Sequence, residues 1–209
     1  MPAINGPIPS EWTNYVTQTN LGLEIIPAVL YSTKPYVSAS TQILTFFDTV
    51  QGSRPDLTNM SQQNMLPNPE SFLVENIRIY SKGPVQSDDS GEGDATPLVS
   101  QFDDLAQLVS KGILNLKIGN KQYGPFPLWM LPANSFVKGA FSTGSDLLAD
   151  YGQVDGVLYP LHPNLMIAPL QQFTVTLNWP GGPITLSTGA ESSVDLQILF
   201  DGKLARSIQ

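Results

Sequence analysis

Residues 173–179 alternate strictly between apolar and polar side chains, and this two-residue period constrains the fold more than any other feature of the chain. Successive side chains of a β-strand point to opposite faces of a sheet, so the pattern predicts a strand with one buried face. The same period recurs at 113–118 and 194–200. The apolar positions are Phe173, Val175, Leu177 and Trp179, then Leu114, Leu116 and Ile118, then Val194, Leu196, Ile198 and Phe200. Such strands must join into sheets that cover one another's apolar faces.

Four further segments have the composition of strands: residues 21–31, 41–47, 71–80 and 157–167, with shorter candidates at 122–130, 136–141 and 184–187. Pro27 interrupts the first segment, which predicts an edge position or a bulge there, because proline cannot donate a ladder hydrogen bond. The segment 71–80 has apolar residues on both faces, which predicts a strand covered on both sides. The two sets are Leu73, Ile77 and Ile79, and Phe72, Val74 and Tyr80.

Between these strands the sequence predicts one amphipathic helix. Thr96 can cap its start, Pro97 suits its first position, and Gly112 ends it. Leu98, Phe102, Leu105 and Val109 recur at helical spacing. The 17 glycines and 18 prolines are spread along all 209 residues, as in chains of many short elements joined by turns. We therefore predict an all-β protein, a jelly-roll-type β-sandwich of about eight strands with one inserted amphipathic helix.

Residues 1–20 differ from the rest of the chain because they are polar and rich in proline. Their large side chains are Trp12 and Tyr15. We expect either an extended N-terminal arm anchored by these two aromatics or a floppy terminus, followed by a single sandwich domain over residues 21–209. Within that domain, residues 51–69 and 82–95 form long irregular connections, which in compact domains usually serve a function or lie against a neighbour.

The charge balance argues against several partners. The chain has 10 Lys and Arg against 18 Asp and Glu, a net charge of -8, and charged residues make up only 13%. A negative protein is repelled by phosphate backbones and anionic lipids, so we expect no direct contact with nucleic acid. Residues 1–10 lack the basic and apolar regions of a secretion signal, and no apolar run approaches the ~20 residues that span a bilayer. These features predict a soluble protein.

The acidic stretch 88–94 suggests calcium binding by its spacing. An EF-hand loop that began at Asp88 would need a bidentate glutamate at its twelfth position, which is Val99, so that pattern fails. A looser calcium site formed by Asp88, Glu92 and Asp94 stays open beside the alternative of a solvated acidic loop. Because His162 is the only histidine and there is no cysteine, a transition-metal site of the cupin type lacks its ligands. We expect no cofactor.

Motifs for catalysis are missing as well. The sequence Gly144-Ser145-Asp146 is not a nucleophile elbow. A carboxylate pair for glycoside hydrolysis would leave no local motif, and Asp146, Asp150 and Asp155 lie close together, but carboxylates in turns commonly bind local backbone amides. Trp12, Trp129 and Trp179 could form a platform for stacking sugars, although the alternation of residues 173–179 places Trp179 in the core. We expect His162 to be structural and predict no catalytic residue and no enzyme.

Several stretches of the chain resemble virion structural proteins of bacterial viruses. They are Phe46-Phe47 through Gly52, Leu57-Thr58-Asn59-Met60, Met65-Leu66-Pro67, Pro69-Glu70-Ser71-Phe72-Leu73-Val74, and residues 194–209 with Leu199-Phe200-Asp201-Gly202. The family that these stretches resemble is the single jelly-roll capsid proteins of tailless icosahedral bacteriophages.

This resemblance implies a shell of upright barrels, assembled in the host cytoplasm from copies of the chain and other virion proteins, with no catalytic residues. The arm would reach neighbouring subunits, where burial of Trp12 or Tyr15 contributes on the order of 2–3 kcal/mol each. The chain lacks the basic arm of capsid proteins that grip nucleic acid directly, which favours a shell separated from the genome, with an underlying viral membrane as one way to separate them. Two alternatives stay open: a receptor- or carbohydrate-binding β-sandwich of a viral spike, and a glycoside hydrolase or lyase on a jelly roll.

Overall fold

The structure is a computed structural model that describes residues 23–82, 107–131, 137–138, 152–153, 160–186 and 193–207. Its strands are β1 (Leu23–Val37), β2 (Ile43–Phe46), β3 (Ser71–Lys82), β4 (Ile113–Ile118), β5 (Lys121–Pro127), β6 (Val137–Lys138), β7 (Gly152–Gln153), β8 (Pro160–Ile167), β9 (Phe173–Asn178) and β10 (Ser193–Ser207). A 3-10 turn, η1 (Leu128–Met130), follows β5, and residues 107–111 are helical.

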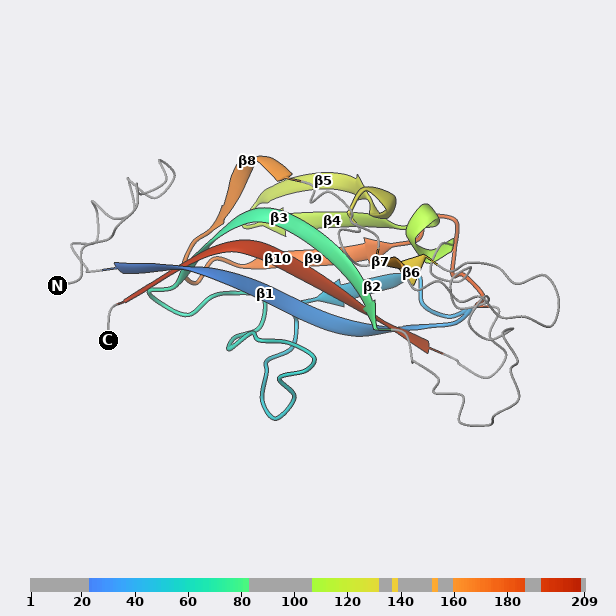
Figure 1. The fold of residues 1–209 in the computed structure, drawn as a ribbon, viewed down its shortest axis with the longest axis horizontal. Helices are drawn as coiled ribbons and strands as arrows, with labels where there is room; N and C mark the ends of the chain where they lie inside the picture. Colours follow the sequence, from blue (N-terminus) through green and yellow to red (C-terminus); the bar gives the residue numbers. More distant parts are fainter. Residues whose placement is uncertain are drawn as a thin grey trace.

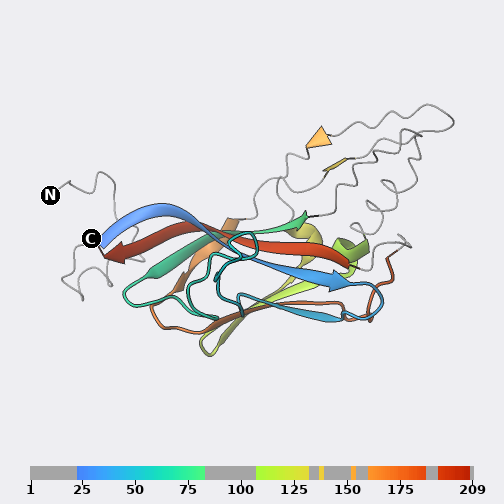
Figure 2. The ribbon, with the colours of Figure 1, turned by 90° about the horizontal axis from the view of Figure 1, so that it is seen from below.

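Eight of these strands form two four-stranded antiparallel sheets, ordered β1-β10-β3-β8 and β2-β9-β4-β5. The pairs β1–β10, β2–β9, β3–β8 and β4–β5 nest inside one another along the chain, so the chain folds back on itself once and winds into two layers (Figures 1 and 2). This is the topology of a jelly roll, and it confirms the predicted fold class. The short strands β6 and β7 pair with each other as a separate two-stranded sheet.

The core lies between the two sheets and is built by the alternation seen in the sequence. In β9 each apolar residue is buried and each polar residue is half-exposed. In β4, Leu114, Leu116 and Ile118 are buried, and the residues between them are half-exposed or, at Lys117, exposed. Three aromatic rings meet in the centre: Phe47 lies 5.3 Å from Phe173 and 5.0 Å from Phe200, measured between ring centroids. Rings at these separations add a favourable electrostatic contact to the hydrophobic gain of burial.

Strand β10 is longer than the alternating segment 194–200, because it continues through Asp201, Gly202 and Lys203 to Ser207. Two of its charged residues pair with residues of β3: Asp201 accepts two hydrogen bonds of 2.6 Å from Arg78, and Lys203 lies 2.8 Å from Glu75. Glycine at position 202 allows β10 to lie close to β3, because a Cβ at this position would be 1.8 Å from the backbone oxygen of Leu73. The apolar alternation stops at Phe200, and the strand continues beyond it through ion pairs to β3 and the close contact of Gly202 with β3.

The assignment of faces in β3 was partly wrong. The register against β10 and β8 shifts between Val74 and Asn76, so one extra residue changes the side-chain alternation there. The residues that point into the core are Phe72, Val74, Ile77 and Ile79. Leu73 belongs instead to a small separate cluster with Ala205, and Tyr80 is 40% exposed. A period-2 pattern cannot reveal a bulge, since the bulge breaks the period.

A predicted strand and the end of the predicted helix both lie at the end of the sandwich where β9 finishes. The predicted strand 184–187 is not formed over 184–186: Ile184 is held by the hydroxyl of Tyr36, which accepts from its N–H at 2.5 Å and donates to its carbonyl at 3.0 Å. The helix ends at Lys111 as predicted. Gly112 follows because a Cβ there would lie 2.3 Å from Leu128 Cδ1. The start of the predicted helix lies outside the described residues.

The two outermost strands begin and end at the same end of the molecule. Leu23, which starts β1, pairs with Ser207, which ends β10, and the register continues without a break to Val37 opposite Ser193 (Figure 1). The turn between β4 and β5 lies at this end too, because Gly119 N donates to Gln172 O just before β9. We call it the terminal end of the sandwich. Strands β1, β3, β5 and β9 finish at the other end.

Candidate interaction surfaces

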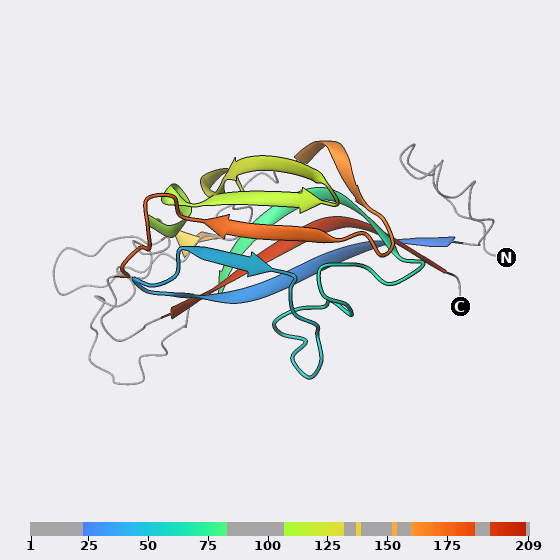
Figure 3. The same cartoon turned by 180° about the vertical axis from the view of Figure 1, so that it is seen from behind.

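The free edge of β1 is covered by the connection between β2 and β3. Thr33 N donates to Leu57 O at 2.7 Å, and Asn59 N donates to Tyr31 O at 3.4 Å. The Asn59 side chain completes the contact: its Oδ1 accepts from Tyr31 N at 2.9 Å, and its Nδ2 donates to Val29 O at 2.6 Å. We call residues 51–60 the strap; it lies beside β1 in Figures 1 and 3. The strap takes the place of a fifth strand in this sheet.

Two prolines protect the rest of the β1 edge. The hydrogen bonds to the strap show that odd-numbered residues of β1 direct their N–H groups away from β10. Pro27 and Pro35 occupy odd positions on either side of the strap, so the missing N–H costs no hydrogen bond to β10 and leaves no donor for another chain. The prediction of an edge position at Pro27 is thereby confirmed.

The other three edge strands are blunted too. Strand β8 contains Pro160 and Pro163 and pairs with β3 only at Pro160 and residues 165–167. Strand β5 contains Pro125 and Pro127, and its register against β4 shifts between Leu114 and Leu116. Strand β2 has four residues. Short edges, prolines and bulges are the devices by which β proteins avoid edge-to-edge pairing. The edges of both sheets therefore offer few free ladder groups to another chain.

The outer face of the β1-β10-β3-β8 sheet carries paired charges. Arg78 binds Asp201 through two nitrogens, and Lys203 binds Glu75. Elsewhere on the molecule Arg206 lies 3.1 Å from Glu24, and two pairs are formed by the connection after β2: Lys34 with Asp48 at 2.6 Å, and Arg54 with Asp56 at 2.7 Å. The exposed pairs, Arg54–Asp56 and Arg206–Glu24, contribute little to stability, whereas the Arg78–Asp201 pair is bidentate and half-buried.

The outer face of the β2-β9-β4-β5 sheet is different, because it carries an apolar row. Ile43 is opposite Asn178, Asn178 is opposite Ile113, and Ile113 is opposite Pro127, so the row crosses all four strands. Ile43 is 59% exposed, and Trp129, two residues beyond Pro127, is 62% exposed. Figure 3 shows this sheet in front. We call Ile43, Asn178, Ile113 and Pro127 the apolar row, because three of its four members are apolar; Ile43 is exposed, and the others are half-buried. Apolar side chains exposed on a sheet face are typical of contact surfaces.

The rest of this outer face is polar and carries one cation. Thr45, Thr176 and Asn115 form the next row, and Lys117 lies opposite Thr174 beyond it. Lys121 follows at the turn of the β4–β5 hairpin. Neither lysine forms an ion pair with any residue that the structure describes. The face therefore has an uncompensated positive charge at the terminal end.

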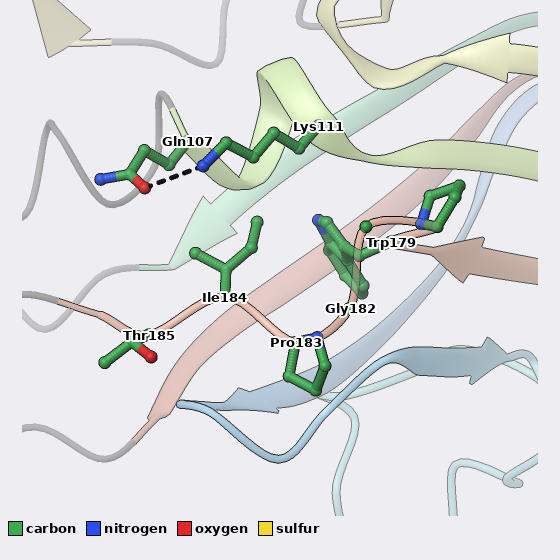
Figure 4. Close-up of a pocket in the computed structure, with 9 residues that line it drawn as sticks. Gln107, Lys111, Trp179, Gly182, Pro183, Ile184 and Thr185 are labelled. Carbon is green, nitrogen blue, oxygen red and sulfur yellow. Dashed lines mark hydrogen bonds between the residues drawn. The ribbon is translucent and has the colours of Figure 1, made fainter.

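A groove opens at the far end of the sandwich, between the helical residues and the turn after β9. Its volume is about 540 Å³, and Figure 4 shows Gln107 and Lys111 above the turn, with the Lys111 amine 3.2 Å from Gln107 Oε1. Other lining residues are Trp179, Pro180, Gly181, Gly182, Pro183, Ile184 and Thr185. Trp179 is fully buried beneath it and donates from Nε1 to the carbonyl of Leu108 at 2.9 Å. Among the described residues that line the groove, Lys111 is the one cation, and there is no carboxylate or histidine.

The residues singled out in the sequence are mostly not brought together. Trp12, Tyr15, Asp88, Glu92, Asp94, Asp146, Asp150 and Asp155 lie outside the described residues. His162 lies in β8. Trp179 is buried while Trp129 is exposed, so these two do not share a sugar-stacking platform. Within the described ranges, no three histidine, cysteine or carboxylate side chains are grouped so that they could hold a metal ion.

Sequence reasoning missed the apolar row and the strap. The row depends on the register that places Ile43, Asn178, Ile113 and Pro127 side by side, which no local pattern reveals. The sequence signal for the strap is the length of the connection 51–69, but this length does not reveal that the connection lies against β1.

Comparisons with family models, curated proteins and solved structures found no match for this chain. Among the residues that the structure describes, no helix has the length and hydrophobicity needed to cross a membrane.

Proposed function

We propose that the protein is a virion structural protein, a capsid subunit that self-assembles into an icosahedral shell by side-by-side packing of its β-barrels. Its role is structural rather than enzymatic, its partners are copies of itself and other virion proteins, and it acts in the virion after assembly in the host cytoplasm. The stretches that resemble single jelly-roll capsid proteins of tailless bacteriophages led to this proposal. The eight-stranded jelly roll is the fold that the resemblance implies.

The observation that carries the proposal is the contrast between closed edges and an open face. All four edge strands resist strand addition, whereas the apolar row lies on the outer face of the β2-β9-β4-β5 sheet. A subunit that packs through faces associates with its barrel axis beside that of its neighbour, which is the arrangement of a shell of upright barrels. Weak contacts repeated around a closed shell suffice to hold it together.

The test is the size of the purified protein. Light scattering coupled to size-exclusion chromatography and negative-stain electron microscopy should show large closed particles or ordered arrays that form above a threshold concentration. The alternative, a receptor- or carbohydrate-binding module of a viral spike, predicts a monomer or trimer that binds members of a glycan array. A small species with glycan affinity would replace the proposed function by that alternative.

A further inference from the structure

Three charged residues meet at the terminal end of the β1-β10-β3-β8 sheet. Glu24 of β1 is opposite Arg206 of β10, and both Nε and Nη2 of Arg206 lie 3.1 Å from Glu24 Oε2. Glu70 stands on the other side of Arg206, because Ala205 pairs with Ser71 and Glu70 directly precedes Ser71. One cation therefore lies between two carboxylates that come from distant parts of the chain.

The cluster is located where the core meets solvent. Arg206 lies on the same side of β10 as Leu204, which packs against the main core, whereas Ala205 between them belongs to the small separate cluster. Glu70 is half-buried and forms no direct ion pair with any described residue. Its negative charge is therefore compensated only at longer range, by a guanidinium that Glu24 already binds.

We infer that Glu24, Arg206 and Glu70 form an acid-responsive clasp, which holds the terminal end of the sheet more firmly when Glu70 is protonated. When Glu70 is ionised, its carboxylate and that of Glu24 attract the same guanidinium. Protonation removes the charge of Glu70 from the half-buried rim and leaves Arg206 to Glu24. The clasp thus adjusts how firmly the first and last strands are joined, and it does not depend on the proposed function.

The direction of the pH response follows from the environment of Glu70. Burial raises the pKa of Glu70 above its ordinary value of 4.5, and the nearby Arg206 guanidinium lowers this pKa by less. The folded state therefore binds the Glu70 proton more tightly than the unfolded chain does. The stabilisation from this group is fully present below the unfolded pKa and is lost as the pH rises through the folded pKa.

The other surroundings of Glu70 bring no further charge. Residues 66–69 precede it, residues 168–172 lie against Leu66, and neither segment contains a charged side chain. Lys203 alternates with Leu204 and binds Glu75, so that pair lies on the opposite face of the sheet. Protonation of Glu24 would break its ion pair with Arg206 and loosen the clasp. Tightening in acid is therefore the signature of Glu70.

Hydrogen exchange followed by mass spectrometry tests the clasp in the full-length protein, because it reports local opening of the strands in peptides that cover residues 23–26 and 204–207. Glu70→Gln imitates the protonated side chain. At pH 7 it should slow exchange in these peptides by about twofold or more, after correction for the intrinsic exchange rate. The difference from the unmodified protein should vanish toward about pH 4, where the unmodified Glu70 is protonated as well.

Glu75→Gln is the matched control, since it makes the same substitution on the opposite face of the sheet. It should not slow exchange at the terminal end at pH 7. In an Arg206→Gln background, the slowing caused by Glu70→Gln should be larger, because the guanidinium no longer compensates the Glu70 carboxylate.

Two results would overturn the clasp. The first is exchange in Glu70→Gln that equals that of the unmodified protein at pH 7, or a difference that persists unchanged down to about pH 4. The second is an effect of Glu70→Gln that is the same with and without Arg206, because Arg206 would then not be the shared cation.

Discussion

Single residues decide two close approaches on which this sandwich depends. At Gly202 the strand β10 lies so near β3 that a Cβ would stand 1.8 Å from Leu73 O. At Tyr36 a buried hydroxyl accepts from the N–H of Ile184, and the Ile184 carbonyl accepts both from this hydroxyl and from Ala39 N at 3.0 Å. Both positions tie the long strands to elements that are distant in sequence, and each leads to a prediction.

Replacing Gly202 by alanine should destabilise the fold by roughly 2–4 kcal/mol, because the added methyl group must displace backbone rather than a flexible side chain. Chemical denaturation followed by tryptophan fluorescence gives the free energy of unfolding. Gly181→Ala is the control: no atom lies within 4 Å of its Cβ position, so its stability should match that of the unmodified protein. Equal losses in the two variants would contradict the role of close packing at Gly202.

Replacing Tyr36 by phenylalanine should cost about 1–3 kcal/mol, because the ring stays in place while the buried N–H of Ile184 loses its acceptor. Burial raises the pKa of Tyr36 above its ordinary value of 10.0, so the folded state holds this proton more tightly than the unfolded chain. The unmodified protein should therefore lose stability as the pH rises above about 10, and this component should be missing in Tyr36→Phe. Denaturation midpoints between about pH 8 and pH 11 measure both effects; identical pH profiles would exclude the hydroxyl as their source.

At the scale of elements, the strap and the edge prolines close the edge of β1, which in other sheets a further strand would cover. The strap matches the outward-directed groups of β1 from Val29 to Thr33, and Pro27 and Pro35 lie just beyond it. Edge strands left open pair with other chains and aggregate. Keeping each edge closed therefore protects the sandwich against edge-to-edge pairing.

Asn59→Ala should expose part of this edge, because the side chain supplies two hydrogen bonds to β1. We expect a loss of about 1–2 kcal/mol in the free energy of unfolding and faster formation of thioflavin-binding aggregates on gentle heating. Gln63→Ala removes an exposed amide from the same connection and serves as the control. Aggregation at the same rate in both variants would show that the strap does not protect the edge.

At the scale of the whole molecule, the alternating segments were sufficient to predict two packed sheets but not how they register. Strands β4 and β9 follow their patterns residue by residue. The faces of β3 were partly misassigned because its bulge follows Val74. The alternation of residues 194–200 stops short of the end of β10, because Asp201 and Lys203 look solvated until Arg78 and Glu75 are placed opposite. The apolar row was hidden for the same reason, since it exists only across strands. Local periodicity indicates which side chains of one strand share a face. Bulges, cross-strand ion pairs and rows of residues across a sheet depend on how strands pair, which local periodicity does not show.

The predicted arm belongs to this scale, because its expected partner is another molecule. Deleting residues 1–18 should leave the described sandwich folded, since its strands begin at Leu23, but should abolish higher assembly through loss of the anchors Trp12 and Tyr15. Circular dichroism checks the fold, and electron microscopy checks the particles. Particles of normal size from the shortened protein would contradict the arm hypothesis.

Because the register between β1 and β10 is uninterrupted, the resistance of this strand pair to force depends on the direction of pulling. Leu23 and Ser207 are directly opposite, so a force that pulls these two residues apart loads one pair of hydrogen bonds at a time and unzips the ribbon at low tension. A force applied between Val37 and Ser207 acts along the strands instead and must shear many pairs together. The same ribbon is therefore compliant toward tension at its terminal end and stiff toward tension along its length, a difference that optical tweezers with handles at these residues would record as two unfolding forces.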